Sequence, residues 1–308
     1  MVSLNNLISH IMKFTKTLSI LCCICSLFTG SLFAQDDLLA QLPTDMEAKT
    51  FSIAGFKSTR VINFHSYEVV GKRSLDFRIS HRFGELSSGI DGFYGIDGPA
   101  SIRLGLEYSH DGRLMVGFGR TSYEKMLDGF LKYRLVRQSE NGSMPINITL
   151  TSSMFVKTGK DPEESITGTN KYKYFSNRIS YCHQLIIGRK FSPKFSAQIA
   201  PTVVHFNMAE RFTDNNDAYF LTGALRYKFT KRIALTAEYG ARMRTYTQQK
   251  VYNSLGVGID IETGGHVFQM FVTNSFGIVE SQFLPFTTNN WSDNGIRIGF
   301  NVSRVFGL

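Results

Sequence analysis

The chain has 308 residues and a formal net charge of +9 with neutral histidines. Its basic residues are scattered rather than grouped in a patch, so the charge does not indicate a nucleic-acid partner. The mean hydropathy is near zero, which excludes a helical membrane protein but suits a β-barrel, where half of each strand faces away from lipid. The aromatic residues are 26 Phe and 13 Tyr against one Trp, which favours β-structure and membrane interfaces.

The N-terminal leader, residues 1–34, has the pattern of a secretory signal peptide. Lys13 and Lys16 precede an apolar run that ends before a small residue, Ala34. A basic start, an apolar core and a small residue before a polar continuation are typical of exported proteins. The run is too short for a stable transmembrane helix. Cleavage would remove two lysines and leave a net charge of 9 − 2 = +7.

The positions of the cysteines predict that the mature chain has no internal disulfide. Cys22, Cys23 and Cys25 lie in the leader, and no small residue precedes them as lipoprotein processing would require. Cys182 is then alone and can form no internal disulfide, so we expect it to be a packed small residue.

Residues 35–70 precede the first clear strand and have mixed character. Their second half is rich in apolar residues, such as Phe51, Phe56 and Phe64. The segment either runs into the lumen of a barrel from the periplasmic side or is a poorly ordered lead-in. We favour the first, because so many apolar residues seldom stay in solvent.

The clearest strand pair spans residues 101–119. Apolar residues alternate with charged residues and glycines on both sides of a turn at Asp111-Gly112. A period of two puts alternate side chains on one face, and Asp-Gly favours a tight hairpin. The same unit recurs to the C-terminus, over residues 75–80, 102–109, 113–119, 131–135, 146–151, 178–187, 195–203, 219–228, 233–242, 255–262, 268–273 and 296–303.

The connections between these stretches alternate in length. The short ones are residues 110–112, 139–144, 189–194, 230–231 and 263–265, and the longer ones are 84–100, 121–128, 158–171, 207–217, 245–250 and 277–293. Short periplasmic turns opposite long outer loops are typical of outer-membrane barrels. A soluble all-β fold is the alternative, but such a fold does not require short connections at one end and long connections at the other. Leu308, with Phe306 two residues before it, partly matches the apolar end of such barrels.

The chain resembles an uncharacterised β-barrel family of Gram-negative bacteria, classed as a domain of unknown function. The segments that carry the resemblance are Phe56–Asn63, Leu75–Gly84, Tyr123–Lys125, Asp128–Arg134 and Ile261–Gln269. The resemblance covers nearly the whole mature chain and implies an outer-membrane-type barrel. The family has no established activity, so no catalytic residue is carried over.

Charged side chains on the polar face of the strands are the candidate functional residues. We expect the following to line the lumen: Arg78, Arg103, Glu107, Lys132, Arg134, Arg178, Arg226, Lys228, Glu238, Arg242, Asp260 and Arg297. Their positive excess would favour anions in a water-filled passage. The alternative is a salt-bridged interior that closes the lumen. About twelve strands lies between filled eight-stranded and open sixteen-stranded barrels, so strand number does not decide.

No catalytic or metal-binding motif stands out. His81 and His183 share parity with lipid-facing residues, while Ser80 and Ser180 point the opposite way from them. A lipid-modifying enzyme would need a Ser/His pair that meets on the outer wall near a rim. The acidic stretch at residues 214–217 resembles a calcium-type cluster, but a solvated loop explains it better. We expect no metal and no cofactor.

Gly117 and Gly119 lie within a strand and open no helix, so they do not form a nucleotide-binding motif. Glycines facing the lumen are expected to mark bends or close packing.

The sequence thus predicts a monomeric, antiparallel up-and-down barrel of about twelve strands over residues 71–308, exported to the outer membrane. Its partners would be outer-membrane lipid, the barrel-insertion machinery during biogenesis, and small solutes or anions, but no nucleic acid. The leading function is a passive pore or small-solute transporter with a positively biased lumen. A closed structural or partner-binding barrel is the second hypothesis, and it requires that the lumen charges all pair.

Overall fold

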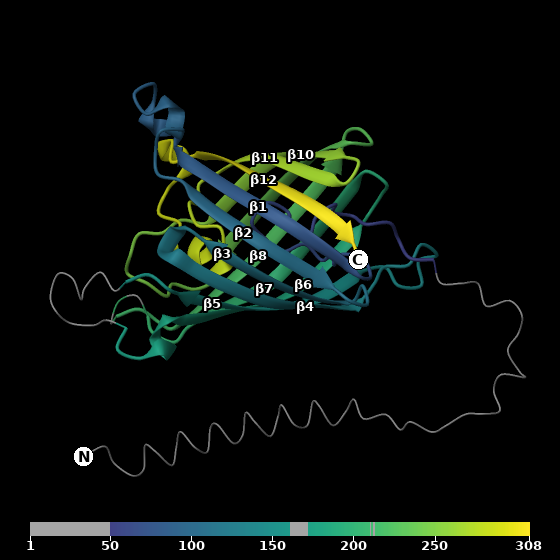
Figure 1. Ribbon diagram of the computed structural model, residues 1–308, viewed down its shortest axis with the longest axis horizontal. Helices are drawn as coiled ribbons and strands as arrows, with labels where there is room; N and C mark the ends of the chain where they lie inside the picture. The colour runs from purple at the N-terminus through teal and green to yellow at the C-terminus, as the bar shows by residue number, and fades with distance from the viewer. Residues whose placement is uncertain (1–49, 161–171, 210, 212) are drawn as a thin grey trace, which may run out of the picture. The chain divides into compact units, whose positions relative to one another are not determined.

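The computed structural model describes residues 50–160, 172–209, 211 and 213–308. The expected leader and residues 35–49 lie outside this part of the chain. Twelve strands of the described residues form a closed barrel (Figure 1). They are β1 (Ser74–Glu85), β2 (Ser101–Ser109), β3 (Leu114–Thr121), β4 (Met126–Val136), β5 (Asn147–Lys157), β6 (Ile179–Lys190), β7 (Phe195–Phe206), β8 (Asp217–Lys228), β9 (Ile233–Arg242), β10 (Ser254–Thr263), β11 (His266–Thr273) and β12 (Arg297–Gly307).

Each strand pairs antiparallel with its neighbours in sequence, and β1 pairs with β12 to close the ring. Ile79, for example, lies opposite Leu104 of β2 on one side and Val302 of β12 on the other. The predicted fold, an up-and-down antiparallel barrel of about twelve strands, is therefore confirmed. Among the described residues, no helix is long and apolar enough to cross a membrane.

The strands have one buried polar face and one exposed apolar face. In β2 the burial alternates residue by residue, so that Arg103 is 1% exposed while Leu104 is 50% exposed. Successive side chains of a strand point to opposite sides. The interior of the barrel is therefore mostly polar, although apolar side chains such as Met126, Phe155 and Phe220 also face inward, and its outer surface carries many large apolar side chains.

The connections differ between the two ends of the barrel. One end has the short turns, residues 110–113, 137–146, 191–194, 229–232 and 264–265. The other end has residues 86–100, 122–125, 158–178, 207–216, 243–253 and 274–296. The prediction of a long connection over residues 121–128 was wrong, because β3 reaches Thr121 and β4 begins at Met126. Glu124 and Lys125 make this tight turn with positive φ angles of 54° and 47°.

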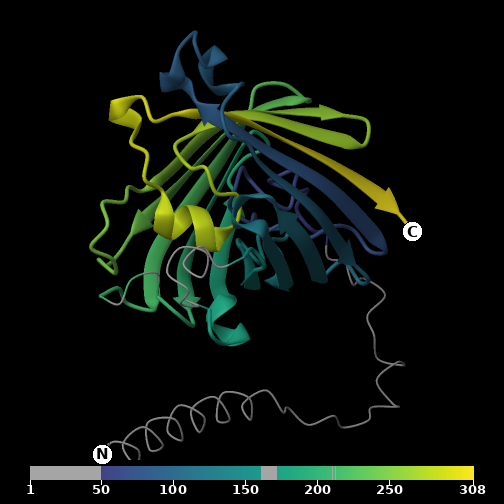
Figure 2. The same ribbon diagram turned by 60° about the vertical axis from the view of Figure 1, so that its left-hand side comes forward.

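Residues 55–70, here called the hairpin plug, fill the inside of the barrel (purple in Figure 2). The N–H of Val61 donates to the carbonyl of Phe64 (2.8 Å), and the N–H of Ser66 donates to the carbonyl of Thr59 (2.9 Å). The hairpin plug enters the lumen from the short-turn end, and both of its ends lie there. Just before the plug, Phe51 pairs with the β4–β5 connection, and at its end Val70 leads directly into β1.

The opposite end of the barrel is closed by the connection between β11 and β12. Its residues 277–287, here called the inward-folded loop, contain the short helix α3 (Glu280–Phe286) and are almost entirely buried. Phe283 and Leu284 of this loop pack in one apolar cluster with Phe64 of the plug and with Phe155 and Phe220 of the wall. The lumen is therefore filled from both ends.

The plugged lumen as the candidate functional site

Glu238 of β9 holds the tip of the hairpin plug. Its carboxylate accepts hydrogen bonds from the backbone N–H groups of Ile62 (3.1 Å), Asn63 (2.9 Å) and Phe64 (3.1 Å). The side-chain amide of Asn63 donates a further bond of 2.7 Å. Charge-assisted hydrogen bonds are stronger than neutral ones. One buried carboxylate therefore accepts from three successive backbone N–H groups at the tip of the plug.

Lys132 of β4 donates hydrogen bonds to carbonyl groups on both legs of the plug. Its ammonium donates to the carbonyls of Thr59 (2.9 Å), Ser66 (3.1 Å) and Glu68 (3.2 Å), which lie on both legs of the plug. An ammonium has three donors and no acceptor, so these three carbonyls use its full capacity. Lys132 thereby joins the two legs to each other and to the wall.

Other wall side chains around the ring also bond to the plug. They are Arg78 (to Ser58 and Thr59), Arg82 (to Asn63), Thr149 (to Tyr67), Gln198 (to His65 and Tyr67), Arg226 (to Gly55), Gln269 (to Val61) and Asn301 (to Ile62). Most of these bonds go to backbone groups of the plug, which has no sheet partner of its own. The polar wall therefore supplies the hydrogen bonds that buried backbone requires.

A glycine on the wall makes room for the largest side chain of the plug. Tyr67 is 2% exposed and lies where a Cβ on Gly188 would stand, against its aromatic ring. Tyr67 also packs edge-on against Phe56 at 5.3 Å between ring centroids. A lumen-facing glycine thus marks close packing, and any side chain at position 188 would displace the tyrosine.

The remaining buried charges pair with one another on the wall. Arg103 makes two bonds to Asp128 (2.9 and 2.6 Å). Arg226 bonds to Asp260 (3.2 Å) and Glu262 (2.5 Å). Among the described residues, the buried cationic side chains are Arg60, Arg78, Arg82, Arg103, Lys132, Arg226 and Arg297, and the buried anionic ones are Asp76, Glu107, Asp128, Glu238, Asp260 and Glu280. Seven against six leaves the interior with almost no net charge.

Eight of the twelve residues expected to line the lumen are buried: Arg78, Arg103, Glu107, Lys132, Arg226, Glu238, Asp260 and Arg297. Arg134, Lys228 and Arg242 are half-buried near the ends of their strands. Arg178 differs from the expectation, because it ends the 3-10 turn η4 (Phe175–Arg178) before β6. Its guanidinium donates to the carbonyl of Gly159 (2.7 Å) and thereby fastens a loop.

Asp76 lies on the same inward face of β1 as Arg78 and is also buried. The other four buried charges were missed in the sequence. Arg82 and Asp128 share the inward parity of their strands, but the predicted strand ended before Arg82 in β1 and began after Asp128 in β4. Arg60 and Glu280 lie in segments without strand periodicity, so no local pattern could have identified them.

Arg60 and Glu280 join the hairpin plug to the inward-folded loop. The guanidinium of Arg60 donates to the Glu280 carboxylate (2.8 Å), and His65 Nε2 lies 3.4 Å from the same oxygen. Beside them, Phe64 of the plug stacks on Phe283 of the loop at 5.3 Å between centroids. The plug from one end and the loop from the other therefore share one ion pair and one aromatic contact.

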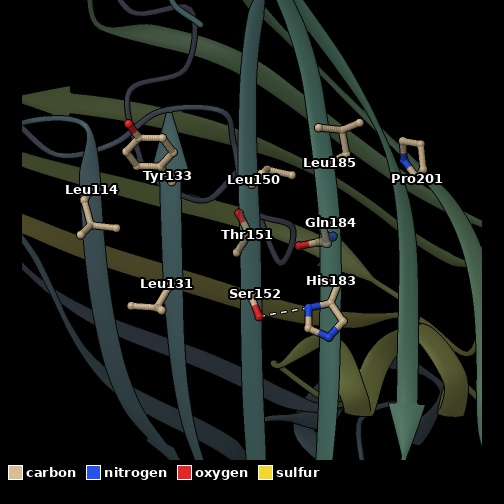
Figure 3. Close-up of a pocket in the computed structure, with 10 residues that line it drawn as sticks. All are labelled: Leu114, Leu131, Tyr133, Leu150, Thr151, Ser152, His183, Gln184, Leu185 and Pro201. Carbon is tan, nitrogen blue, oxygen red and sulfur yellow. Dashed lines mark hydrogen bonds between the residues drawn. The ribbon is translucent and has the colours of Figure 1, made fainter. Parts of the chain in front are cut away.

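A second polar site lies on the outer wall. Ser152 of β5 lies directly opposite His183 of β6, and its hydroxyl is 3.0 Å from His183 Nδ1 (Figure 3). Apolar side chains, including Leu131, Leu150 and Leu185, line a hollow of about 540 Å³ around the pair. The hydrogen bond gives each of these two polar groups a partner on a largely apolar surface.

This pair lacks two features that a hydrolase requires. None of the described residues bonds to the second ring nitrogen of His183, so nothing orients the imidazole as the third member of a triad does. Ser152 and His183 also lie near the middle of their strands rather than at a rim.

The acidic loop at residues 214–217 bonds to the connection between β9 and β10. Asp214 accepts hydrogen bonds from the Thr247 hydroxyl (3.0 Å) and from the N–H of Gln248 (3.3 Å). Within the part of the chain that the structure describes, no three His, Cys, Asp or Glu side chains are grouped as metal ligands.

A family model described as "Membrane bound beta barrel domain (DUF5777)" matches residues 56–306. The chain belongs to this family. The match begins inside the hairpin plug, so the DUF5777 domain includes the plug as well as the strands. Membership identifies the barrel as membrane-bound, and the apolar outer surface of the strands is then its lipid-facing surface.

Several solved structures are similar in fold at low identity. The KdgM porin is 13% identical with a TM-score of 0.44, over 76% of this chain and 99% of that chain. The COG4313 outer membrane channel from Pseudomonas putida F1 is 14% identical with a TM-score of 0.43, over 78% and 98%. Outer membrane phospholipase A from Escherichia coli is 10% identical with a TM-score of 0.42, over 75% and 92%. The chain has no match among curated proteins.

Proposed function

We propose that the protein is a small-solute channel of the outer membrane that is closed in this conformation and opens when the hairpin plug leaves the lumen and the inward-folded loop, which then loses its contacts with Arg60 and Phe64, moves outward. The observation that carries the proposal is the chemistry of the wall. A permanently closed barrel can fill its interior with apolar wall side chains. Here most of the buried wall side chains are polar, and a separate N-terminal segment, together with the inward-folded loop, fills the space between them. Without that segment the lumen would be lined by groups that suit water and solutes.

The path of the plug supports the same function. Both ends of the plug lie at the short-turn end of the barrel, which faces the periplasm in an outer-membrane barrel. The hairpin can therefore withdraw in one direction without threading an end through the ring. The near balance of buried charge argues against strong anion selection inside the lumen.

A closed structural or partner-binding barrel is the second candidate function. The observation in its favour is that most charged side chains in the lumen form ion pairs with one another. The two functions differ in what happens when the plug is displaced. A channel then conducts, whereas a structural barrel loses stability and conducts nothing.

Planar-bilayer conductance separates these functions. The full mature protein is expected to be closed most of the time. A variant without residues 50–70 is expected to conduct steadily, because the inward-folded loop then also loses the ion pair and the aromatic contact that join it to the plug. Gly188→Val keeps the whole chain and is expected to raise the open fraction, because the new side chain occupies the place of the Tyr67 ring. A steadily open parent, or silence from both variants when they are correctly folded, would refute the plugged channel.

A lipid-modifying enzyme is the third possibility, and Ser152 tests it. Ser152→Ala is expected to change the free energy of unfolding by only about 1 kcal/mol, the contribution of one ordinary hydrogen bond. Neither parent nor variant is expected to hydrolyse phospholipid, measured as fatty-acid release from mixed micelles. Hydrolysis by the parent that Ser152→Ala abolishes would assign the pair a catalytic role.

A further inference from the structure

We propose that the mouth of the barrel at the short-turn end holds a binding site for small anions that carry carboxylate or phosphate groups. A pocket of about 640 Å³ lies there between the base of the hairpin plug and the wall. Its lining includes four cationic side chains, Lys72, Arg113, Arg134 and Arg137. Two carboxylates, Glu68 and Asp111, also line it.

Three of these cations have unused hydrogen-bond donors. Among the described residues, none accepts a hydrogen bond from the side-chain nitrogens of Lys72, Arg113 or Arg137. Arg113 lies over the ring of Tyr133 at 5.9 Å, and Arg137 lies over the ring of Phe51 at 4.8 Å. A guanidinium stacked on a ring is held in place while its N–H groups remain available at the edge.

Both carboxylates are already engaged. Asp111 accepts from the N–H groups of Arg113 and Leu114, both at 2.8 Å, and these bonds lower its pKa below the usual range. Glu68 accepts from the N–H of Gly55 (2.8 Å) and pairs with Arg134 (3.5 Å). The two acidic groups therefore serve the turn and the plug, and the three free cations face the pocket.

One residue that lines the pocket also bonds to the hairpin plug. Arg134 also donates to the carbonyl of Val69 (3.4 Å), so one lining residue holds the second leg of the hairpin. An anion bound beside Arg134 would compete with Glu68 for the guanidinium. This consequence rests on the proposed channel function, but binding itself is measured on the closed protein and does not require opening.

Titration calorimetry of the full mature protein in a neutral maltoside detergent tests the site, with inorganic phosphate and citrate as separate probes. The double variant Arg113→Gln/Arg137→Gln is expected to raise the apparent Kd about tenfold or more, since it removes two charged donors. Arg189→Gln is the matched control. Arg189 is exposed at the same end and lies over Phe191 at 5.4 Å, but it does not line the pocket.

Binding that the double variant weakens and the control leaves unchanged supports the site. Repeating the citrate titration in lipid nanodiscs identifies the natural source of the anion. Loss of citrate binding in phosphatidylglycerol discs, but not in phosphatidylcholine discs, shows that a lipid headgroup occupies the pocket. Equal binding in both supports a free anion. No binding of either probe in detergent, or equal weakening by Arg189→Gln, overturns the proposal even if the channel conducts.

Discussion

Replacing Glu238 with alanine is expected to release the hairpin plug while leaving the ring of strands closed. The change removes the acceptor of three backbone N–H groups and of the Asn63 amide. A buried donor left without a partner costs about 1–3 kcal/mol, so docking of the plug should weaken by roughly 3–5 kcal/mol when part of the tip rehydrates. That corresponds to a ratio of docked to released plug lower by about 10²–10⁴. The open fraction in planar bilayers measures this ratio.

Two further variants make the result specific. Glu238→Gln keeps one carbonyl acceptor and is expected to give a smaller increase in the open fraction. Asp128→Asn is the matched control, because Asp128 is a buried wall carboxylate whose two bonds go to Arg103 of the wall and not to the plug. If Glu238→Ala stays as closed as the parent, or if Asp128→Asn opens the barrel equally, the plug is not held as the geometry indicates.

The second large effect is expected at the ion pair between Arg60 of the plug and Glu280 of the inward-folded loop. Both side chains are at most 4% exposed. Removing one partner of a buried pair leaves the other charge uncompensated and costs about 3–5 kcal/mol. Arg60→Met and Glu280→Gln are therefore each expected to destabilise the closed state strongly. The double variant should cost less than the sum, with a coupling energy of about 0.5–3 kcal/mol.

The heat-modified migration of the folded barrel in gels measures these stabilities for all four proteins of the cycle. Glu124→Gln serves as the comparison, since its pair with Lys157 (2.8 Å) is partly exposed at the same end of the barrel and should be worth no more than about 1 kcal/mol. Strict additivity of Arg60→Met and Glu280→Gln would contradict a direct coupling of plug and loop.

The strands could be predicted because their signal is local. Each strand alternates between an apolar and a polar face, so neighbours such as Arg103 and Leu104 reveal both the strand and its two sides. The boundary at β4 was missed for an equally local reason. The turn at Glu124 and Lys125 uses positive φ angles without glycine, so the residues that usually mark a turn are absent.

The candidate site could not be predicted in the same way, because its contacts join distant segments. Glu238 bonds to residues more than 170 positions before it, and the plug has no period of its own. The pairing of Ser152 with His183 depends on the register of β5 against β6, which are joined by the long connection 158–178. Alternation predicts which face a side chain takes, but it does not predict which residue lies opposite on the next strand.

The groups that hold the hairpin plug come from strands around the whole ring: Arg78 and Arg82 from β1, Lys132 from β4, Gln198 from β7, Glu238 from β9 and Asn301 from β12. These side chains converge only after β1 has met β12, the pairing with the greatest sequence separation in the barrel. We therefore expect docking of the plug to follow closure of the ring, since an unclosed sheet offers it only part of its partners. The segment translated before any strand is then expected to be the last to reach its place, and its protection from protease is expected to appear only when the ring has closed.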